Sequence, residues 1–434
     1  MSVEHVAASN PVQIVIGGGW GSEAKGCIAA YLAVKEDIDI AVRTGATNAG
    51  HTAFYNGKPY VMQQLPVGWV NPSTRLVLGA GSLIDIDILN REVAMVNEAT
   101  GGVDDVRRRL TLDYRAYIHS AAHHDRATSA DRHHLMGATG KGCSEALIDR
   151  VRLRGLDNWT VGANQGLFDG YDIVDTEQWL NDAWDEGAKV QLEGTQGQLL
   201  DLYLGPYPYT THKQTGPAQW MCEAGLSPAL PVDIVMVLRT YPIRVAGNSG
   251  PMPREIDWPT LAREINRKRW TFGLPSIVAE NAIDAFEGAV RTAARSFGPM
   301  QIPVGSDGTD QHAWTDRMHY RTALSELNKA ALALLDEDTR KELTNLFEMT
   351  TVTKKLRRVA RLSEDMLIVA GRQVRPSRVA VTFLNYKYPK RWFTTDPVTN
   401  SERAYLSTIE SACGSRVTLI NRGPKPEHIV EVFE

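Results

Sequence analysis

Short apolar runs of strand length alternate along the chain with longer stretches of helical periodicity. The first run, residues 12–16, ends in three glycines and is followed by a helical pattern over 23–34. This order of strand, glycine turn and helix is typical of the opening unit of a nucleotide-binding α/β fold. The pattern predicts further strands at 38–42, 75–78, 110–114, 190–192, 234–239 and 379–383, and helices at 87–97, 144–154, 258–268, 321–336 and 401–412.

The alternation predicts an α/β fold in which helices wrap a mainly parallel sheet. Internal repeats, low-complexity tracts and clear linkers are absent, so we expect residues 1–434 to form a single domain. Two stretches, 99–135 and 270–320, are interpreted as insertions. The second would serve either as a lid or as a dimer contact.

Charge and cysteine content narrow the class of protein. The formal net charge is −4, so no nucleic-acid partner is expected. Four cysteines that lie far apart indicate neither a zinc motif nor a disulfide framework, and they favour a reducing compartment. Because no signal peptide and no apolar run of membrane-spanning length is found, we expect a cytoplasmic protein without a membrane partner (host cytoplasm if phage-encoded).

Two segments are candidates for phosphate chemistry. Residues 17–26, GGGWGSEAKG, combine glycines that admit a phosphate with a helix N-terminus and with Lys25. Their spacing is not that of a Walker A motif, so a plain tight turn explains this segment equally well. In Asn48-Ala49-Gly50-His51-Thr52, the histidine suits a phosphate contact or acid catalysis, although a lone histidine in a polar loop more often serves as a turn or cap.

Together with six later segments, these two resemble the signatures of the adenylosuccinate synthetase family. The later matches are residues 65–68, residues 137–142, residues 193–197 with 200–201 and 207–211, Arg244 with 250–253 and Glu255, residues 350–353 with 357–358, and residues 423–424. Each motif is weak alone, but their colinear order across nearly the whole chain argues strongly against coincidence. The resemblance implies the P-loop-like fold of that family with insertions.

The resemblance also implies a ligase that joins L-aspartate to C6 of a 6-oxopurine nucleotide. The O6 atom first takes the γ-phosphoryl group of a nucleoside triphosphate, and the aspartate amine then displaces that phosphate. One site must therefore hold a nucleoside monophosphate, a triphosphate, Mg²⁺ and aspartate, and positioning and charge stabilisation carry the reaction. His51 would stabilise or protonate the O6 region, and Lys25 would contact phosphate.

The other roles are implied in the same way. The monophosphate nucleotide would be held by Ser22, Asn48, Thr139, Gln196 and Thr211. The aspartate carboxylates would be bound by Thr351, Thr353 and Arg357, and the planar guanidinium of arginine suits bidentate binding. The triphosphate would contact Gly21, Gly50, Thr52, Asn385 and Gly423, and the Gly50 carbonyl would bind Mg²⁺.

The family is a homodimer in which an arginine of one subunit reaches the nucleotide of the other. The expected position here holds Leu153. We therefore assign this contact to Arg152, and Arg154 stays open as the alternative.

A first departure from the family pattern concerns the nucleotide substrate. The family has an aspartate that takes the N1 proton of IMP and binds Mg²⁺, whereas this chain has Ser22, whose neutral hydroxyl serves neither role well. A hydroxyl leaves room for the 2-amino group of guanine and can accept a hydrogen bond from it. This favours dGMP as the substrate, as in the phage 2-aminoadenylosuccinate synthetase branch.

Other interpretations of Ser22 stay open. GMP is a further candidate substrate, and an ordinary adenylosuccinate synthetase that uses IMP and GTP is the alternative enzyme. An inactive nucleotide-binding regulatory protein is a third possibility. The retention of His51, Lys25 and Arg357 argues against that last interpretation.

A second departure concerns the phosphoryl donor. The family usually has Thr-Lys-Leu-Asp where this chain has Thr382-Phe383-Leu384-Asn385. Asn385 lacks the carboxylate that accepts from guanine, so ATP or dATP is predicted as the donor beside GTP. Guanine could instead be held by residues 421–424. Lys354-Lys355 stands where Gly-Arg is common in the aspartate loop.

A histidine-rich region lies outside these motifs. It contains His119, His123, His124, His133 and His134, with Asp125 and Asp131. Imidazole and carboxylate are suitable ligands for a transition metal, but the spacing matches no metal motif. We therefore favour a polar loop near the nucleotide or the dimer interface.

Overall fold

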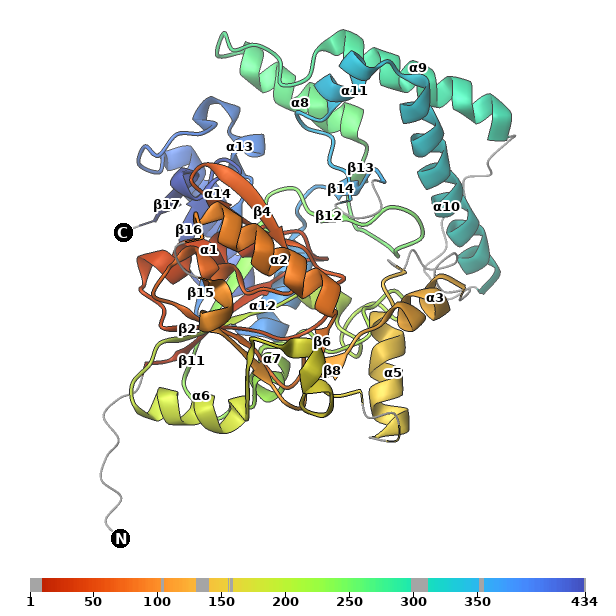
Figure 1. The fold of residues 1–434 in the computed structure, drawn as a ribbon. Coiled ribbons are helices and arrows are strands. Elements are labelled where there is room, and N and C mark those ends of the chain that lie inside the picture. The colour runs from red at the N-terminus through yellow and green to blue at the C-terminus, as the bar shows by residue number, and fades with distance from the viewer. Residues whose placement is uncertain are drawn as a thin grey trace.

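A ten-stranded sheet forms the centre of the computed structural model, which describes residues 10–102, 105–129, 140–154, 156, 159–297, 311–350 and 355–432 (Figure 1). Its strand order is β17-β16-β15-β11-β1-β10-β2-β5-β7-β9, and every neighbouring pair is parallel except β16 and β17. The strands are β1 (Val12–Gly17), β2 (Ile40–Arg43), β5 (Arg75–Leu78), β7 (Leu110–Asp113), β9 (Asp172–Val174), β10 (Val190–Glu193), β11 (Val232–Arg239), β15 (Arg378–Thr382), β16 (Val417–Asn421) and β17 (Ile429–Glu431). The predicted mainly parallel α/β fold is confirmed.

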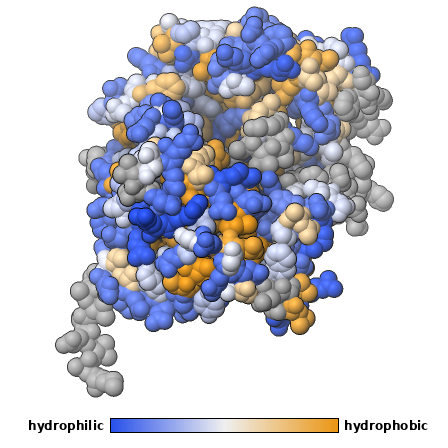
Figure 2. Space-filling view, viewed as in Figure 1, coloured by the Kyte–Doolittle hydropathy of each residue, from blue (hydrophilic) through white to orange (hydrophobic). Residues whose placement is uncertain are grey.

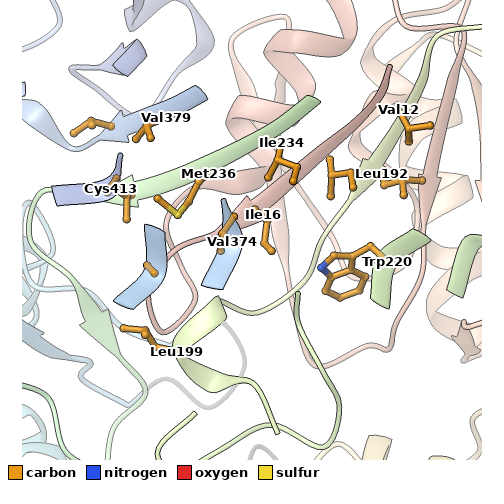
Figure 3. Packing of buried hydrophobic residues seen from close by; sticks show 14 of the residues in the cluster. Val12, Ile16, Leu192, Leu199, Trp220, Ile234, Met236, Val374, Val379 and Cys413 are labelled. Carbon is orange, nitrogen blue, oxygen red and sulfur yellow. The ribbon is translucent and has the colours of Figure 1, made fainter. Parts of the chain in front are cut away.

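The alternation of apolar side chains along the strands explains why helices cover both faces of the sheet. In β1, Ile14 and Ile16 belong to one buried cluster, whereas Val15 between them belongs to another. The first cluster includes residues of α6 (Thr176–Asp185), α7 (Pro217–Ala224), α12 (Glu364–Val374) and α14 (Asn400–Cys413). The second includes residues of α1 (Lys25–Lys35) and α2 (Ile86–Ala99). Figure 3 shows Ile16 and Met236 of the sheet close to Val374 of α12. A strand buried on both faces reads as a continuous apolar run, which is why β1 was predicted from the sequence.

A layer of helices stands on one side of the sheet (Figure 1). It consists of α8 (Trp258–Trp270), α9 (Glu280–Phe297), α10 (Gln311–Leu334) and α11 (Glu337–Leu343). This layer has its own hydrophobic cluster, in which Ile283 and Phe286 of α9 pack with Leu261 of α8 and Phe347. The stretch 270–320, interpreted from the sequence as an insertion, thus contains α9 and the beginning of α10.

Three small sheets in the described part of the chain lie outside the ten-stranded sheet. They are the hairpin of β3 (His51–Tyr55) and β4 (Lys58–Met62), the pair β6 (Leu83–Ile84) and β8 (Tyr117–Ile118), and the small sheet of β12 (Ile243–Arg244), β14 (Arg358–Ala360) and β13 (Glu255–Ile256). Three short helices complete the description: α3 (Ala121–Ser129), α5 (Cys143–Leu153) and α13 (Leu384–Lys387).

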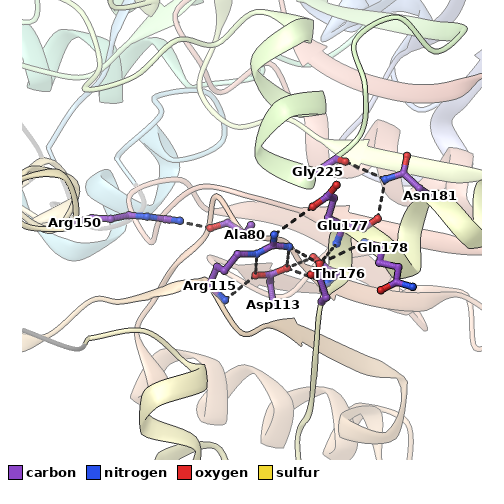
Figure 4. Close-up of polar contacts among 10 residues, drawn as sticks. Ala80, Asp113, Arg115, Arg150, Thr176, Glu177, Gln178, Asn181 and Gly225 are labelled. Carbon is purple, nitrogen blue, oxygen red and sulfur yellow. Dashed lines mark hydrogen bonds and ion pairs between the residues drawn. The ribbon is translucent and has the colours of Figure 1, made fainter. Parts of the chain in front are cut away.

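A polar network fixes the β7 end of the sheet (Figure 4). The buried Asp113 accepts hydrogen bonds from the backbone and hydroxyl of Thr176 at 3.0 and 2.7 Å, and Arg115 pairs with the same carboxylate at 3.0 Å. Nearby, Arg150 of α5 donates to the Ala80 carbonyl at 2.9 Å. These contacts hold α5 and α6 against the sheet.

Hydrophilic side chains cover most of the face shown in Figure 2, with apolar residues interspersed among them. In the part of the chain that the structure describes, no helix combines the length and the apolar character that crossing a membrane requires.

Candidate active site

A cavity of about 1070 Å³ lies at the carboxyl ends of the parallel strands. Its wall includes residues of the loops that follow β1 and β10, together with Arg239 and Thr382 at the ends of β11 and β15. Ligands of open α/β sheets bind at this edge, because loops from several strands converge there. Eleven residues that were predicted for the site lie in this wall: Gly21, Ser22, Lys25, Asn48, Gly50, His51, Thr52, Gln196, Thr211, Arg357 and Gly423.

Five predicted residues lie elsewhere or are not described. Asn385 is buried in α13 and does not line the cavity. Arg152 is exposed on α5 and also does not belong to the wall. Thr139, Thr351 and Thr353 fall outside the described residues.

The glycine-rich first loop holds its lysine beside a carboxylate. Lys25 Nζ lies 2.8 Å from Glu23 Oε2, and both side chains are 3% exposed. The other oxygen of Glu23 accepts from the Gly21 backbone at 2.7 Å. Gly26 lets helix α1 approach strand β3, because a Cβ there would come within 2.7 Å of the His51 Cβ. The contacts within this loop therefore hold the Lys25 ammonium group at the cavity wall.

His51 lies in a buried network at the start of β3. Its Nδ1 makes a short hydrogen bond to Glu193, which also accepts from Arg43 at 2.9 Å and from the Val67 backbone at 2.7 Å. Burial, together with the charge of Arg43, lowers the pKa of His51 to about 4. Although burial alone would raise the pKa of Glu193, Arg43 and His51 hold it below its ordinary value. His51 is thus neutral at physiological pH, and its Nδ1 is fixed by an ionised carboxylate.

Polar amides meet on the adjoining part of the wall. Gln196 donates to the Asn48 side-chain oxygen at 3.1 Å and accepts from the Thr195 hydroxyl at 3.0 Å. The structure thus brings together two residues that were predicted to bind the same nucleotide, although they are far apart in the sequence.

Two arginines hold Ser22. Arg357 Nη1 donates to the Ser22 hydroxyl at 2.8 Å, and Arg239 Nη1 donates to the Ser22 carbonyl at 3.3 Å. Arg239 is buried, forms a bidentate pair with Glu348, and stacks at 3.5 Å on the ring of Phe383. Arg239 and Glu348 were not singled out from the sequence. The available signal was a charged residue at the end of a buried strand.

The helical layer contributes to the same cavity. Thr322, Ser325 and Glu326 of α10 line it, and Glu326 pairs with Lys355 at 3.2 Å. Positions separated by three and four residues lie on one face of a helix, so this face of α10 is directed toward the cavity. The helix predicted at 321–336, directly after the stretch interpreted as an insertion, therefore adds residues to the candidate site.

Comparison with known proteins is consistent with this arrangement. The family described as adenylosuccinate synthetase matches residues 14–169 and 169–276. The adenylosuccinate synthetase of Pyrococcus sp. (strain ST700) is 30% identical over 426 residues, which cover 97% of this chain and 98% of that protein. The enzyme of Thermococcus onnurineus (strain NA1) is 38% identical over 248 residues, or 57% of this chain and 70% of that protein.

Two solved structures share the fold. Succinoaminodeoxyadenylate synthetase of cyanophage S-2L, bound to dGMP and to dATP as an energy donor, has a TM-score of 0.68 at 23% identity and covers 98% of this chain and 96% of that one. Fully ligated adenylosuccinate synthetase from Plasmodium falciparum has a TM-score of 0.68 at 17% identity and covers 97% and 100%.

Proposed function

We propose that this chain, which belongs to the adenylosuccinate synthetase family of C–N ligases, joins L-aspartate to C6 of dGMP and so forms 2-amino-deoxyadenylosuccinate. The observation that carries the choice of dGMP is the position of Ser22 in the cavity wall. The lining carboxylates that the structure describes are Glu145, Glu326 and Glu348, and none of them belongs to the first loop. A hydroxyl there leaves space for a 2-amino group and keeps a lone pair to accept from it.

The surrounding contacts support this role for Ser22. Arg357 donates a hydrogen bond to the Ser22 hydroxyl oxygen at 2.8 Å. This contact holds the oxygen in position and leaves its second lone pair for the base. The backbone at Ser22 has a φ of 60°, in the left-handed region, and the Arg239 contact to its carbonyl stabilises that conformation. The hydroxyl is therefore held in place before a nucleotide binds, which lowers the cost of recognising the base.

Phosphoryl transfer to O6 would rely on groups that are already positioned. Lys25 would contact the transferred phosphoryl group, and the backbone N–H groups of the first loop would bind phosphate oxygens. His51, oriented through Nδ1 by Glu193, would present Nε2 to the O6 region. The negative charge of the bound phosphates favours uptake of a proton from water at that nitrogen, and the Glu193 carboxylate would stabilise the resulting imidazolium, which can donate a hydrogen bond to O6.

Mg²⁺ fits this wall as an ion that the triphosphate carries. Mg²⁺ is commonly bound by one or two protein oxygens together with substrate phosphates. Gly50 lies in the cavity wall, and its carbonyl would supply such an oxygen. When bound, the ion would neutralise charge on the β- and γ-phosphates.

ATP or dATP is the donor that we propose. Phe383 lines the cavity and offers an apolar ring, whereas Asn385 is buried away from the wall. Stacking on an aromatic ring does not distinguish adenine from guanine, so the guanine selectivity of an acceptor carboxylate is lost. The solved cyanophage enzyme, which was bound to dATP as its energy donor, supports this choice.

A homodimer completes the proposal. Arg152 is exposed on α5, where it is available to a second subunit, and it would contact the monophosphate of that subunit. Exposure alone does not distinguish it from Arg154, which is exposed on the same helix end. Substituting each in turn and measuring the KM for the monophosphate would assign the contact.

The test is a substrate panel. The purified protein is incubated with aspartate, Mg²⁺ and either ATP or GTP, and IMP, GMP and dGMP are offered separately, with the succinyl-nucleotide detected by mass. We expect product from dGMP and none from IMP. Product from IMP alone would make the protein an ordinary adenylosuccinate synthetase with a tolerated serine. Binding without any product would favour a regulatory protein.

A further inference from the structure

We propose that Asp85, His119 and His124 form a binding site for a transition-metal dication such as Zn²⁺, outside the cavity and distinct from the Mg²⁺ of the triphosphate. One ligand atom from each residue lies within 4.8 Å of the other two. Asp85 Oδ2 lies 3.6 Å from His124 Nε2, and the rings of His119 and His124 are stacked with centroids 4.7 Å apart. None of the three residues lines the cavity.

Asp85 is free to bind a metal without losing its structural role. It is the N-cap of α2, where Oδ1 accepts from the backbones of Asp87 and Ile88 at 3.1 Å. Only Oδ2 faces His124. The two oxygens thus have separate partners, and a monodentate metal contact through Oδ2 leaves the helix cap intact.

His119 supplies the observation that points to a ligand. Its side chain is 2% exposed, and although the ring also interacts with the Lys141 backbone, its Nε2 is buried without a well-formed hydrogen bond among the described residues. Buried polar atoms in folded proteins are normally paired, so such a nitrogen requires an explanation. Its Nδ1 lies 3.5 Å from the Thr47 hydroxyl, which helps to fix the ring with Nε2 left for a metal.

The chemistry of the three ligands selects the class of ion. Two imidazoles and one carboxylate suit Zn²⁺, Co²⁺ or Ni²⁺, whereas Mg²⁺ and Ca²⁺ prefer oxygen ligands. Three protein ligands leave a coordination position for water. The neighbouring His123 is not a member of the set, because it contacts Asp149 at 3.3 Å and accepts from the Ser120 backbone at 2.9 Å.

The position of the site suggests what a bound metal would do. It would join the start of α2 to the first turn of α3, which packs beside α5 (Figure 1). Gly142 lies against this turn, since a Cβ there would come within 2.5 Å of the His123 carbonyl carbon. Gly140 to Gly142 line the cavity. Metal binding is therefore expected to stabilise the protein and, if the proposed function holds, to tighten binding of the monophosphate.

Equilibrium dialysis tests the site directly. Untagged full-length protein is stripped with a chelator and dialysed against Zn²⁺ in the presence of millimolar Mg²⁺, and bound metal is measured by elemental analysis. We expect one Zn²⁺ per chain in the wild type. We expect at least about 10-fold weaker binding in His124→Ala and in Asp85→Asn, since the latter keeps an oxygen for the helix cap. Asp125→Asn, next to His124 on α3, is the matched control and should bind like the wild type.

Two further measurements sharpen the result. Zn²⁺ should raise the melting temperature of the wild type and of Asp125→Asn, but not that of His124→Ala. Co²⁺ should give visible absorption bands that His124→Ala lacks. Equal Zn²⁺ binding by all variants, or none by the wild type, overturns the proposal. Because no nucleotide is present, a negative result leaves the proposed ligase activity untouched, and a positive one does not depend on it.

Discussion

The two walls of the cavity differ in how firmly their charged groups are held. Behind the first wall, which carries Lys25 and His51, Lys25 pairs with Glu23 and Arg43 pairs with Glu193, the partner of His51, and all four side chains are at most 3% exposed. The second wall, formed by α10 and the residues around Lys355 and Phe383, is mixed: Lys355 and Glu326 are 39% and 41% exposed, whereas Arg239 is 2% exposed in its pair with Glu348. Fixed, buried charges stabilise a transition state without reorganisation, whereas exposed ones adapt to a ligand at little cost. The buried pairs therefore suit the chemistry, and the exposed pair on α10 suits adaptation to a bound substrate.

The two walls also differ in the match to the family model. That match covers residues 14–276, which include the first wall, whereas the similarity to the adenylosuccinate synthetase of Pyrococcus sp. extends over 97% of the chain and so includes the second wall. We therefore expect substitution of the buried charged groups behind the first wall to lower turnover with every substrate. The exception on this wall is Ser22, an exposed residue of the first loop that we propose selects the base. Substitutions in the second wall should change the affinity for the donor or for aspartate.

The largest effect is expected from His51→Asn. Without the imidazole no group is oriented by Glu193 toward O6, and kcat with dGMP should fall about 10²- to 10⁴-fold. Glu193→Gln, which keeps the ring but removes its carboxylate partner, should cause a smaller loss. Steady-state kinetics measure both. A loss below about 10-fold in His51→Asn would remove His51 from the chemistry.

Ser22→Asp should change the preferred substrate. The larger carboxylate fills the space for the 2-amino group and restores a base for IMP, so dGMP turnover should fall and IMP turnover should rise, each by about 10- to 100-fold. Ser22→Ala is the control, because it removes the hydroxyl without filling the space and should gain no activity with IMP. Unchanged preference in Ser22→Asp would contradict the proposed reason for dGMP.

The sequence predicted the first wall better than the second, for a physical reason. Buried parallel strands are continuous apolar runs, and the loops that follow them carry local glycine and histidine signatures, so Lys25 and His51 could be recognised. Parallel topology then brings such loops to one edge. Arg239 pairs with a glutamate 109 residues away, and no local pattern encodes that contact.

The same limit applies to the helical layer and the histidine cluster. Helix α9 packs through Ile283 and Phe286 only because α8 and α10 supply the other side of the cluster. Asp85 caps α2 in a segment distant from the histidines, so spacing could not reveal that it faces His124. The features that could not be predicted from the sequence are therefore contacts between elements that lie far apart along the chain.

Phe383→Leu should weaken binding of the phosphoryl donor. Leucine removes the ring that stacks on Arg239 at 3.5 Å and faces the cavity, and the KM for ATP should rise about 10-fold, which corresponds to roughly 1.4 kcal/mol. The KM for GTP should rise equally, because a ring does not select between purines. The KM for aspartate, measured in the same variant, should stay unchanged. A selective loss of one donor would show that Phe383 reads the base.

The pKa of His51 predicts a change of stability with pH. The pKa is about 4 in the folded protein, below the ordinary 6.5 of an unfolded histidine. The unfolded chain thus binds the proton first, and the contribution of His51 is complete above pH 6.5 and is lost as the pH falls toward 4. Between pH 7.5 and 6.0 the loss is about 1 kcal/mol. Because burial also lowers the pKa of His119 and His212, the wild type should lose more than this in urea unfolding, and the difference between the wild type and His51→Asn should show the share of His51.

The smallest effect is expected on the second wall, from Glu326→Gln. Glu326 pairs with Lys355 at 3.2 Å, and Lys355 stands next to residues that we expect to bind aspartate. The glutamate competes with the substrate carboxylate for that cation, so its removal should lower the KM for aspartate about 3-fold, as an exposed pair contributes less than about 1 kcal/mol. Glu337→Gln, on α11, is the matched control and should leave the KM unchanged. A raised KM would mean instead that Glu326 positions Lys355 for the substrate, and the adaptable wall would then be preorganised like the first.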